Sequence, residues 1–128
     1  MPNATAVWTG RVMSGLLAAF LAFSAGIKLI HRPEVAETLV PLGWPADAGF
    51  ALGVLEATVL VLYLIPRTAV LGAILMTGLL GGAMATHVRV GSPLFSHILF
   101  GLYMGLFAWG GLWLRDARLR ALFPWRKS

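Results

Sequence analysis

The chain has 128 residues, of which 59% are hydrophobic and only 12% are charged. About a quarter of the residues in a soluble domain are charged, so this composition excludes an ordinary soluble protein and predicts a single membrane domain over residues 1–128. The chain has no cysteine, which excludes disulfides and cysteine-ligated iron–sulfur clusters. The net charge of +5 comes from basic residues that flank apolar segments, so we expect contact with the lipid bilayer and none with nucleic acid.

Four stretches of the chain are apolar enough to be transmembrane helices, since one span needs about 20 mostly apolar residues. They cover residues 9–30, 47–65, 68–88 and 94–114. The turn between the second and third is very short, so those two helices must be antiparallel neighbours. The sequence therefore predicts an all-α, polytopic membrane protein built as a four-transmembrane-helix bundle.

Two further segments are predicted to be short interfacial helices. Residues 33–43 begin with Pro33, which suits a first helical turn, and end with Gly43, which suits a helix end. In residues 116–124, Asp116 is placed to cap a second short helix. The arginines of this second helix would face anionic headgroups while its apolar side chains enter the bilayer.

The distribution of basic residues predicts the orientation of the chain in the membrane. Three basic residues lie on one side, and seven lie on the side of the termini: Arg11, Arg67, Arg115, Arg118, Arg120, Arg126 and Lys127. Because cytoplasmic loops carry the excess of Lys and Arg, both termini are predicted to be cytoplasmic. We expect the first span to be retained, since Phe23 fits poorly in a signal-peptide cleavage site.

Glu56 is the main candidate for a functional residue, because it lies near the middle of an apolar span. A lone ionisable group at that depth costs roughly 2.5–3.5 kcal/mol on insertion scales, so it is a site hypothesis by default. Thr77 falls at nearly the same depth on the next span, counted at about 1.5 Å per helical residue. Four other candidates fall in the outer half of the spans, and these are Lys28, His87, Arg89 and His97.

This asymmetry predicts a polar pocket that opens outward, with Glu56 as its floor and residues 33–43 as its lid. The axial gap between Lys28 and Glu56 is roughly 8–10 Å, which predicts that water or a ligand bridges part of it. As an alternative, Thr77 or Tyr103 would bond a protonated Glu56 and make it a structural residue. The histidines lack a local metal-binding spacing, so no metal is predicted.

Several strings of the sequence carry a resemblance to a known family. They are FSAGIKL at 23–29, LGVLE at 52–56, LIPRTAVLGAIL at 64–75, TGLLGG at 77–82, THVRVG at 86–91 and LRDARLRAL at 114–122. With these strings the chain resembles the DoxX-like family of small four-helix bacterial membrane proteins. The family takes its name from a subunit of a thiosulfate:quinone oxidoreductase. The resemblance therefore implies the bacterial inner membrane and a quinone as the cofactor or ligand, and it matches Lys28, Glu56, His87 and Arg89 to the family pattern.

Three functions follow from these observations, and the sequence leaves open whether the protein is an enzyme. The first is an accessory or oxidoreductase-linked component whose pocket holds a small lipophilic, quinone-like molecule, with Glu56 and His87 relaying a proton. The second is a cofactorless enzyme in which Glu56 and His87 act as acid and base on a lipophilic substrate. The third is a small proton-coupled permease, which would need a homo-oligomer of at least two chains.

Overall fold

The computed structural model describes residues 4–30 and 32–122, and every regular element within them is helical. In chain order they are α1 (Ala4–Leu29), α2 (Pro33–Leu39), the 3-10 turn η1 (Val40–Leu42), α3 (Ala48–Leu64), the 3-10 turn η2 (Pro66–Thr68), α4 (Ala69–Val90), the π-helical turn η3 (Leu94–Ile98), α5 (Phe100–Arg115) and α6 (Ala117–Leu122). The predicted all-α fold class is confirmed.

The four predicted apolar helices are present, and they differ in length. Three helical stretches are long and apolar enough to cross a membrane, and these are Ala4–Leu29, Pro66–Val90 and Leu94–Arg115. The fourth, α3, has 17 residues. It ends where Pro66 begins the next turn, and at about 1.5 Å per residue it reaches the lower end of the length that spans a bilayer. The apolar helices confirm a protein embedded in the lipid bilayer.

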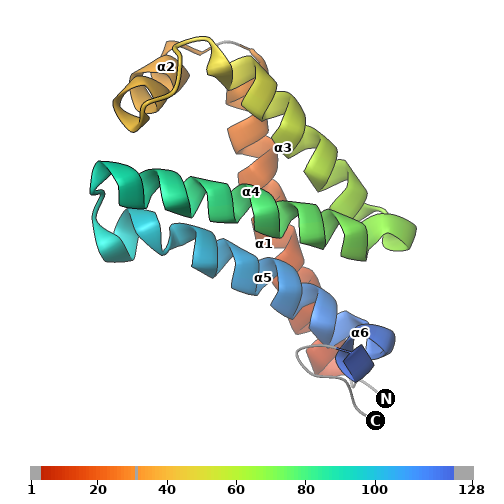
Figure 1. Ribbon diagram of the computed structural model, residues 1–128. Coiled ribbons are helices and arrows are strands. Elements are labelled where there is room, and N and C mark those ends of the chain that lie inside the picture. The colour runs from red at the N-terminus through yellow and green to blue at the C-terminus, as the bar shows by residue number, and fades with distance from the viewer. Residues whose placement is uncertain (1–3, 31, 123–128) are drawn as a thin grey trace.

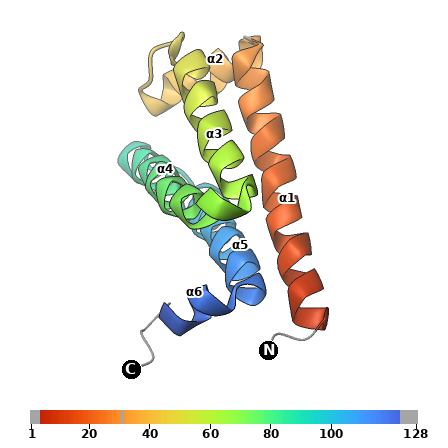
Figure 2. The same cartoon turned by 90° about the vertical axis from the view of Figure 1, so that its right-hand side faces the viewer.

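The four long helices form a ring in which each packs chiefly against two others. α1 contacts α3 and α5, and α4 also contacts α3 and α5. Figure 2 shows α1 and α3 running side by side, whereas Figure 1 shows α4 and α5 lying together and crossing in front of α1. The most deeply buried large side chains come from three of these helices, and they are Leu17, Leu21, Val59 and Met76.

The predicted helix over residues 33–43 is present as α2 followed by η1. Pro33 occupies the first helical turn, and Gly43 ends η1 with a φ of 91°, a left-handed conformation that glycine adopts without strain. At the start of α2, the exposed Arg32 guanidinium donates a hydrogen bond to Glu34, which lowers the pKa of that carboxyl below its usual value. The buried Val35 packs against α3 beside Gly49.

The predicted C-terminal interfacial helix is present as α6. The Asp116 carboxylate accepts hydrogen bonds from the backbone N–H groups of Arg118 and Leu119, at 2.9 and 3.4 Å. These bonds satisfy amide groups that have no partner within the helix, as a capping residue does. Residues 123–124 of the predicted helix lie outside the described residues.

Gly72 allows α4 to pack directly on the backbone of α3. A Cβ atom at this position would overlap the backbone of Tyr63 and lie 2.8 Å from the carbonyl carbon of Leu62. Neither backbone atom can move away as a flexible side chain could, so the contact requires glycine. Close approach through small residues is the usual way in which membrane helices pack, because lipid supplies no hydrophobic drive between them.

We expect Gly72→Leu to lower the free energy of unfolding. Overpacking a core typically costs about 1–3 kcal/mol, and the loss here should be at least that large because the clash is with backbone. Gly78→Leu is the matched control on the same helix, because a Cβ atom at Gly78 meets nothing within 4 Å. Thermal unfolding in detergent, followed by size-exclusion chromatography, compares the two variants. Equal melting temperatures for both would contradict this account of the α3–α4 contact.

Candidate functional site

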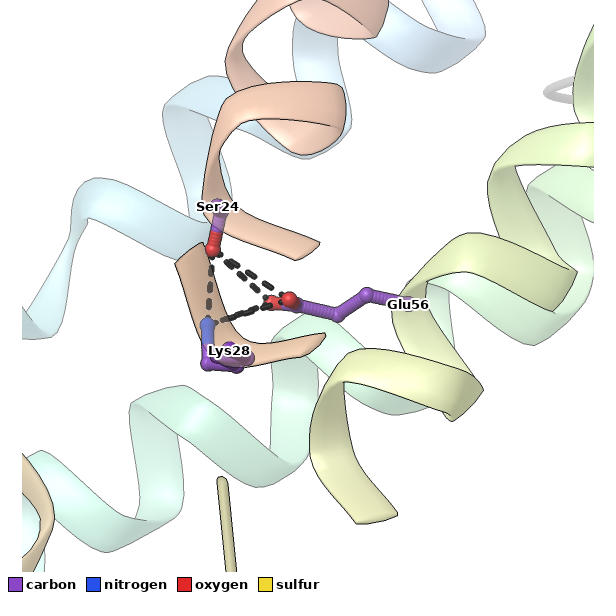
Figure 3. A network of polar contacts seen from close by, with 3 residues as sticks. All are labelled: Ser24, Lys28 and Glu56. Carbon is purple, nitrogen blue, oxygen red and sulfur yellow. Dashed lines mark hydrogen bonds and ion pairs between the residues drawn. The ribbon is translucent and has the colours of Figure 1, made fainter. Parts of the chain in front are cut away.

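Ser24, Lys28 and Glu56 form a hydrogen-bonded cluster between α1 and α3 (Figure 3). The Lys28 ammonium lies 3.0 Å from Glu56 Oε2 and 3.2 Å from Oε1, and it donates to the Ser24 hydroxyl at 2.7 Å. The Ser24 hydroxyl lies 3.2 Å from both carboxylate oxygens and donates to them. The charge of Glu56 is thus balanced by Lys28, and Ser24 bridges the two.

The expectation that water or a ligand would bridge Lys28 and Glu56 is wrong, because the two side chains meet directly. Ser24 and Lys28 are one turn apart on the same face of α1. Gly53 lies one turn before Glu56, and a Cβ atom on it would stand only 2.8 Å from Lys28 Cβ and 3.2 Å from the Ala25 carbonyl oxygen. With no side chain between the helices at this level, the lysine reaches the carboxylate.

The cluster is neither sealed nor fully open. The side chains of Lys28 and Glu56 are 16% and 13% exposed. Ser24 supplies one hydrogen and Lys28 three, of which one goes to Ser24, so at most three hydrogens reach the carboxylate. A carboxylate has about four lone-pair positions, which leaves Glu56 able to accept one more hydrogen bond.

His87 and His97 lie against one another at the ends of α4 and η3. Their ring centroids are 5.5 Å apart and the rings meet edge to face. The Nδ1 atom of His87 is 2.9 Å from the Ser92 hydroxyl, and Nδ1 of His97 is 2.7 Å from the Ser96 hydroxyl. The structure therefore brings these two predicted residues together, with a serine on each imidazole.

Arg89 connects α4 to the segment that precedes α3. Its Nη2 atom donates to the Leu42 carbonyl oxygen at 2.9 Å, and its guanidinium lies against Gly43. This residue was predicted at the mouth of a pocket. In the structure it holds η1, and with it the α2–η1 segment, against the end of α4.

Thr77 and Tyr103 do not bond Glu56, so the alternative in which they fasten a protonated carboxyl is wrong. The Thr77 hydroxyl donates to the Ala73 carbonyl at 2.8 Å and accepts from the Trp109 indole at 2.7 Å. The Tyr103 hydroxyl donates to the Phe95 carbonyl at 3.0 Å. Both side chains lie on the α4–α5 pair, whereas the Glu56 carboxylate lies between α1 and α3.

A second polar network, which the sequence interpretation missed, joins α1, α3 and α5 near the termini. Arg115 donates to the Ser14 hydroxyl at 2.9 Å, Ser14 lies 2.7 Å from the Tyr63 hydroxyl, and Tyr63 donates to the Ala108 carbonyl at 2.7 Å. Since Tyr63 uses its hydrogen on Ala108, Ser14 is the donor to Tyr63. The sequence feature that could have indicated this network is the occurrence of two polar residues, Ser14 and Tyr63, inside apolar spans.

A layer of buried apolar side chains separates this network from the Ser24–Lys28–Glu56 cluster. Leu17 and Leu21 on α1 and Val59 on α3 lie between the two in sequence, and each is at most 2% exposed. The α1–α3 interface thus has a polar site at each end and tightly packed apolar side chains between them.

In the part of the chain that the structure describes, no three His, Asp or Glu side chains come together as a metal site would require. Comparison with known families matches residues 12–111 to the DoxX-like family. This region contains all three residues of the cluster and extends from α1 into α5. No curated protein and no solved structure gives a significant match.

We expect the ion pair to couple Lys28 and Glu56 energetically. Lys28→Met leaves the Glu56 carboxylate unpaired, and Glu56→Leu leaves the Lys28 ammonium unpaired. Removing one partner of a buried pair costs about 3–5 kcal/mol because the remaining charge has no counter-ion in a low-dielectric site. The partial exposure of both side chains places the cost at the lower end of that range. The double variant should lose much less than the sum of the two single variants.

Unfolding in mixed micelles measures this double-mutant cycle. The exposed pair Arg32 and Glu34 provides the matched control, because the nitrogen–oxygen distance is 2.9 Å and both side chains are more than half exposed. A cycle on that pair should show no measurable coupling. Additive losses for Lys28 and Glu56 would show that the pair does not form in the membrane.

Proposed function

Because this chain belongs to the DoxX-like family, we propose that it is a membrane component that binds a small lipophilic molecule of the quinone or quinol class at the Ser24–Lys28–Glu56 cluster. In this proposal the protein is an accessory part of a membrane oxidoreductase system. It contributes binding and the handling of a proton.

The observation that carries the proposal is a partly exposed Lys–Glu pair inside an apolar helix bundle. A buried ion pair is often no more stabilising than apolar side chains of the same volume, so stability alone does not explain it. Ionisable residues within membrane spans mark substrate sites and proton paths by default. These arguments support a role in ligand binding.

The chemistry of the cluster suits a ligand that carries a hydroxyl or a carbonyl oxygen. The remaining acceptor position of Glu56 would receive a quinol hydroxyl, and proton transfer along that bond would leave the ligand oxygen anionic and Glu56 neutral. Lys28, released from its partner's charge, would then donate to the anionic oxygen. We further propose that His87, Arg89 and His97 line the approach from the outer side, with the α2–η1 segment as its cover.

The structure gives less support to the two alternatives. Glu56 is bonded to Ser24 and Lys28, and His87 to Ser92, so the two residues of the proposed acid–base enzyme have separate partners. For a permease, the packed layer of Leu17, Leu21 and Val59 stands between the polar ends of the α1–α3 interface. A one-sided binding site accords better with both observations.

We expect purified protein to bind decylubiquinol, and Glu56→Gln to weaken that binding by about 10-fold or more, which corresponds to one hydrogen bond to a charged group. Glu37→Gln on the exposed side of α2 is the control and should bind as the parent protein does. Titration of the detergent-solubilised protein, with melting temperature as a check on folding, provides the measurement. The proposal fails if the parent protein binds neither quinone nor quinol, or if Glu56→Gln binds equally well.

We also propose that both termini are cytoplasmic, in a bacterial inner membrane, as the seven basic residues on that side favour. The chain has no cysteine, so single introduced cysteines can be labelled without background. In intact cells, a membrane-impermeant maleimide should label Ala46→Cys, in the loop before α3, and should label Ala117→Cys only after the membrane is permeabilised. The reverse pattern would invert the orientation.

A further inference from the structure

A groove of about 620 Å³ runs along the α4–α5 pair. Its volume lies within the range of small-molecule sites, about 300–1,000 Å³. Its lining is almost wholly apolar and includes Gly81, Gly105, Trp109 and Trp113. Thr77 also lines it, but the hydroxyl of Thr77 is already bonded to Ala73 and Trp109. The groove therefore suits an apolar occupant.

Glycines create the open volume of this groove. A Cβ atom at Gly81 or at Gly105 would meet nothing within 4 Å, so neither glycine is needed for contact between the two helices. Gly101 differs, because a Cβ atom there would lie 2.9 Å from the Leu80 carbonyl oxygen. The helices thus touch near Gly101 and leave a hollow further along.

The Arg120 side chain lies at the end of the groove nearest the termini. Arg120 on α6 donates from Nη1 to the Trp113 carbonyl at 2.6 Å, and its guanidinium lies 5.7 Å from the centre of the Trp113 ring. Trp113 itself lines the groove. A guanidinium has five N–H donors, so Arg120 keeps donors for an anionic oxygen. Figure 2 shows α6 leaving the end of α5 sideways, as a helix at the membrane surface does.

We propose that the α4–α5 groove binds one acyl chain of an anionic phospholipid whose phosphate is held by Arg120. From Gly101 to Leu114, α5 rises about 20 Å, which is longer than the half-thickness of the hydrocarbon core, about 15 Å. An acyl chain that starts at the level of α6 would therefore find a continuous apolar surface through its own leaflet. This site is separate from the Ser24–Lys28–Glu56 cluster and does not depend on the function proposed for it.

A lipid fits the groove better than a second copy of the chain does. A dimer with its two-fold axis along the membrane normal would place the two copies of this groove face to face, with both Arg120 side chains at the same level. Like charges at that level repel, whereas a lipid phosphate supplies the opposite charge. The charge at the end of the groove thus favours an anionic lipid.

Two adjacent glycines test the acyl-chain part of the proposal. Gly81→Leu fills the groove, because Gly81 lines it. Gly82→Leu adds the same side chain at a residue that does not line the groove, and a Cβ atom at Gly82 also meets nothing within 4 Å. Native mass spectrometry of the purified protein with added dioleoyl phosphatidylglycerol measures binding. We expect the bound fraction to fall severalfold for Gly81→Leu and to stay unchanged for Gly82→Leu. Equal binding in the two variants would overturn the proposal.

Two arginines of α6 test the headgroup part. With phosphatidylglycerol and phosphatidylcholine of identical acyl chains, the parent protein should prefer the anionic lipid by about fivefold, the effect of one basic residue at the surface. Arg120→Gln should abolish this preference, and Arg118→Gln, exposed on the same helix, should keep it. No preference in the parent protein would overturn the proposal. The proposal would also be overturned if the groove were a contact between two protomers. In that case Gly81→Leu would convert a dimer to a monomer, and lipid binding would stay constant.

Discussion

The charge of Glu56 within an apolar bundle is the constraint on which the α1–α3 pair depends. The carboxylate needs a cation and donors, and Lys28 and Ser24 supply both from one face of α1. This is possible only because Gly53 removes the side chain that would separate the helices. The ion pair therefore depends on how closely α1 approaches α3 and on the axial register of the two helices. A change in any of these three features would alter the other two.

The same interface carries a second polar network at its other end, built from Arg115, Ser14 and Tyr63. Buried apolar side chains lie between the two networks. Each network can therefore hold its helices together without forming a continuous polar path across the bilayer. This separation keeps the Ser24–Lys28–Glu56 cluster local to one end of the interface, and it is the physical basis for proposing binding over transport.

The α1–α3 pair and the α4–α5 pair differ in where their polar groups lie. The α1–α3 pair buries its polar groups between the helices, where a ligand would have to share the bonds of Glu56. In the α4–α5 pair, Thr77 is hydrogen-bonded to Trp109, and an apolar groove remains, with Arg120 against Trp113 at one end of it. A lipophilic ligand with a polar head and a membrane phospholipid would thus be recognised at two separate places by the same physical rules.

The sequence alone determined the helical fold class, the apolar helices and the two short helices α2 and α6, because long apolar runs, proline, glycine and a capping aspartate act locally. The sequence also identified Glu56 and Lys28 as candidate site residues, since charged residues in apolar spans are rare. Only the tertiary structure decided their partners. The direct contact of Lys28 with Glu56 depends on the axial register that Gly53 permits, and the separate bonds of Thr77, Tyr103 and Arg89 depend on which helix faces meet. Depth along a helix follows from counting residues, but the rotation and crossing of helices follow from packing between segments far apart in the chain.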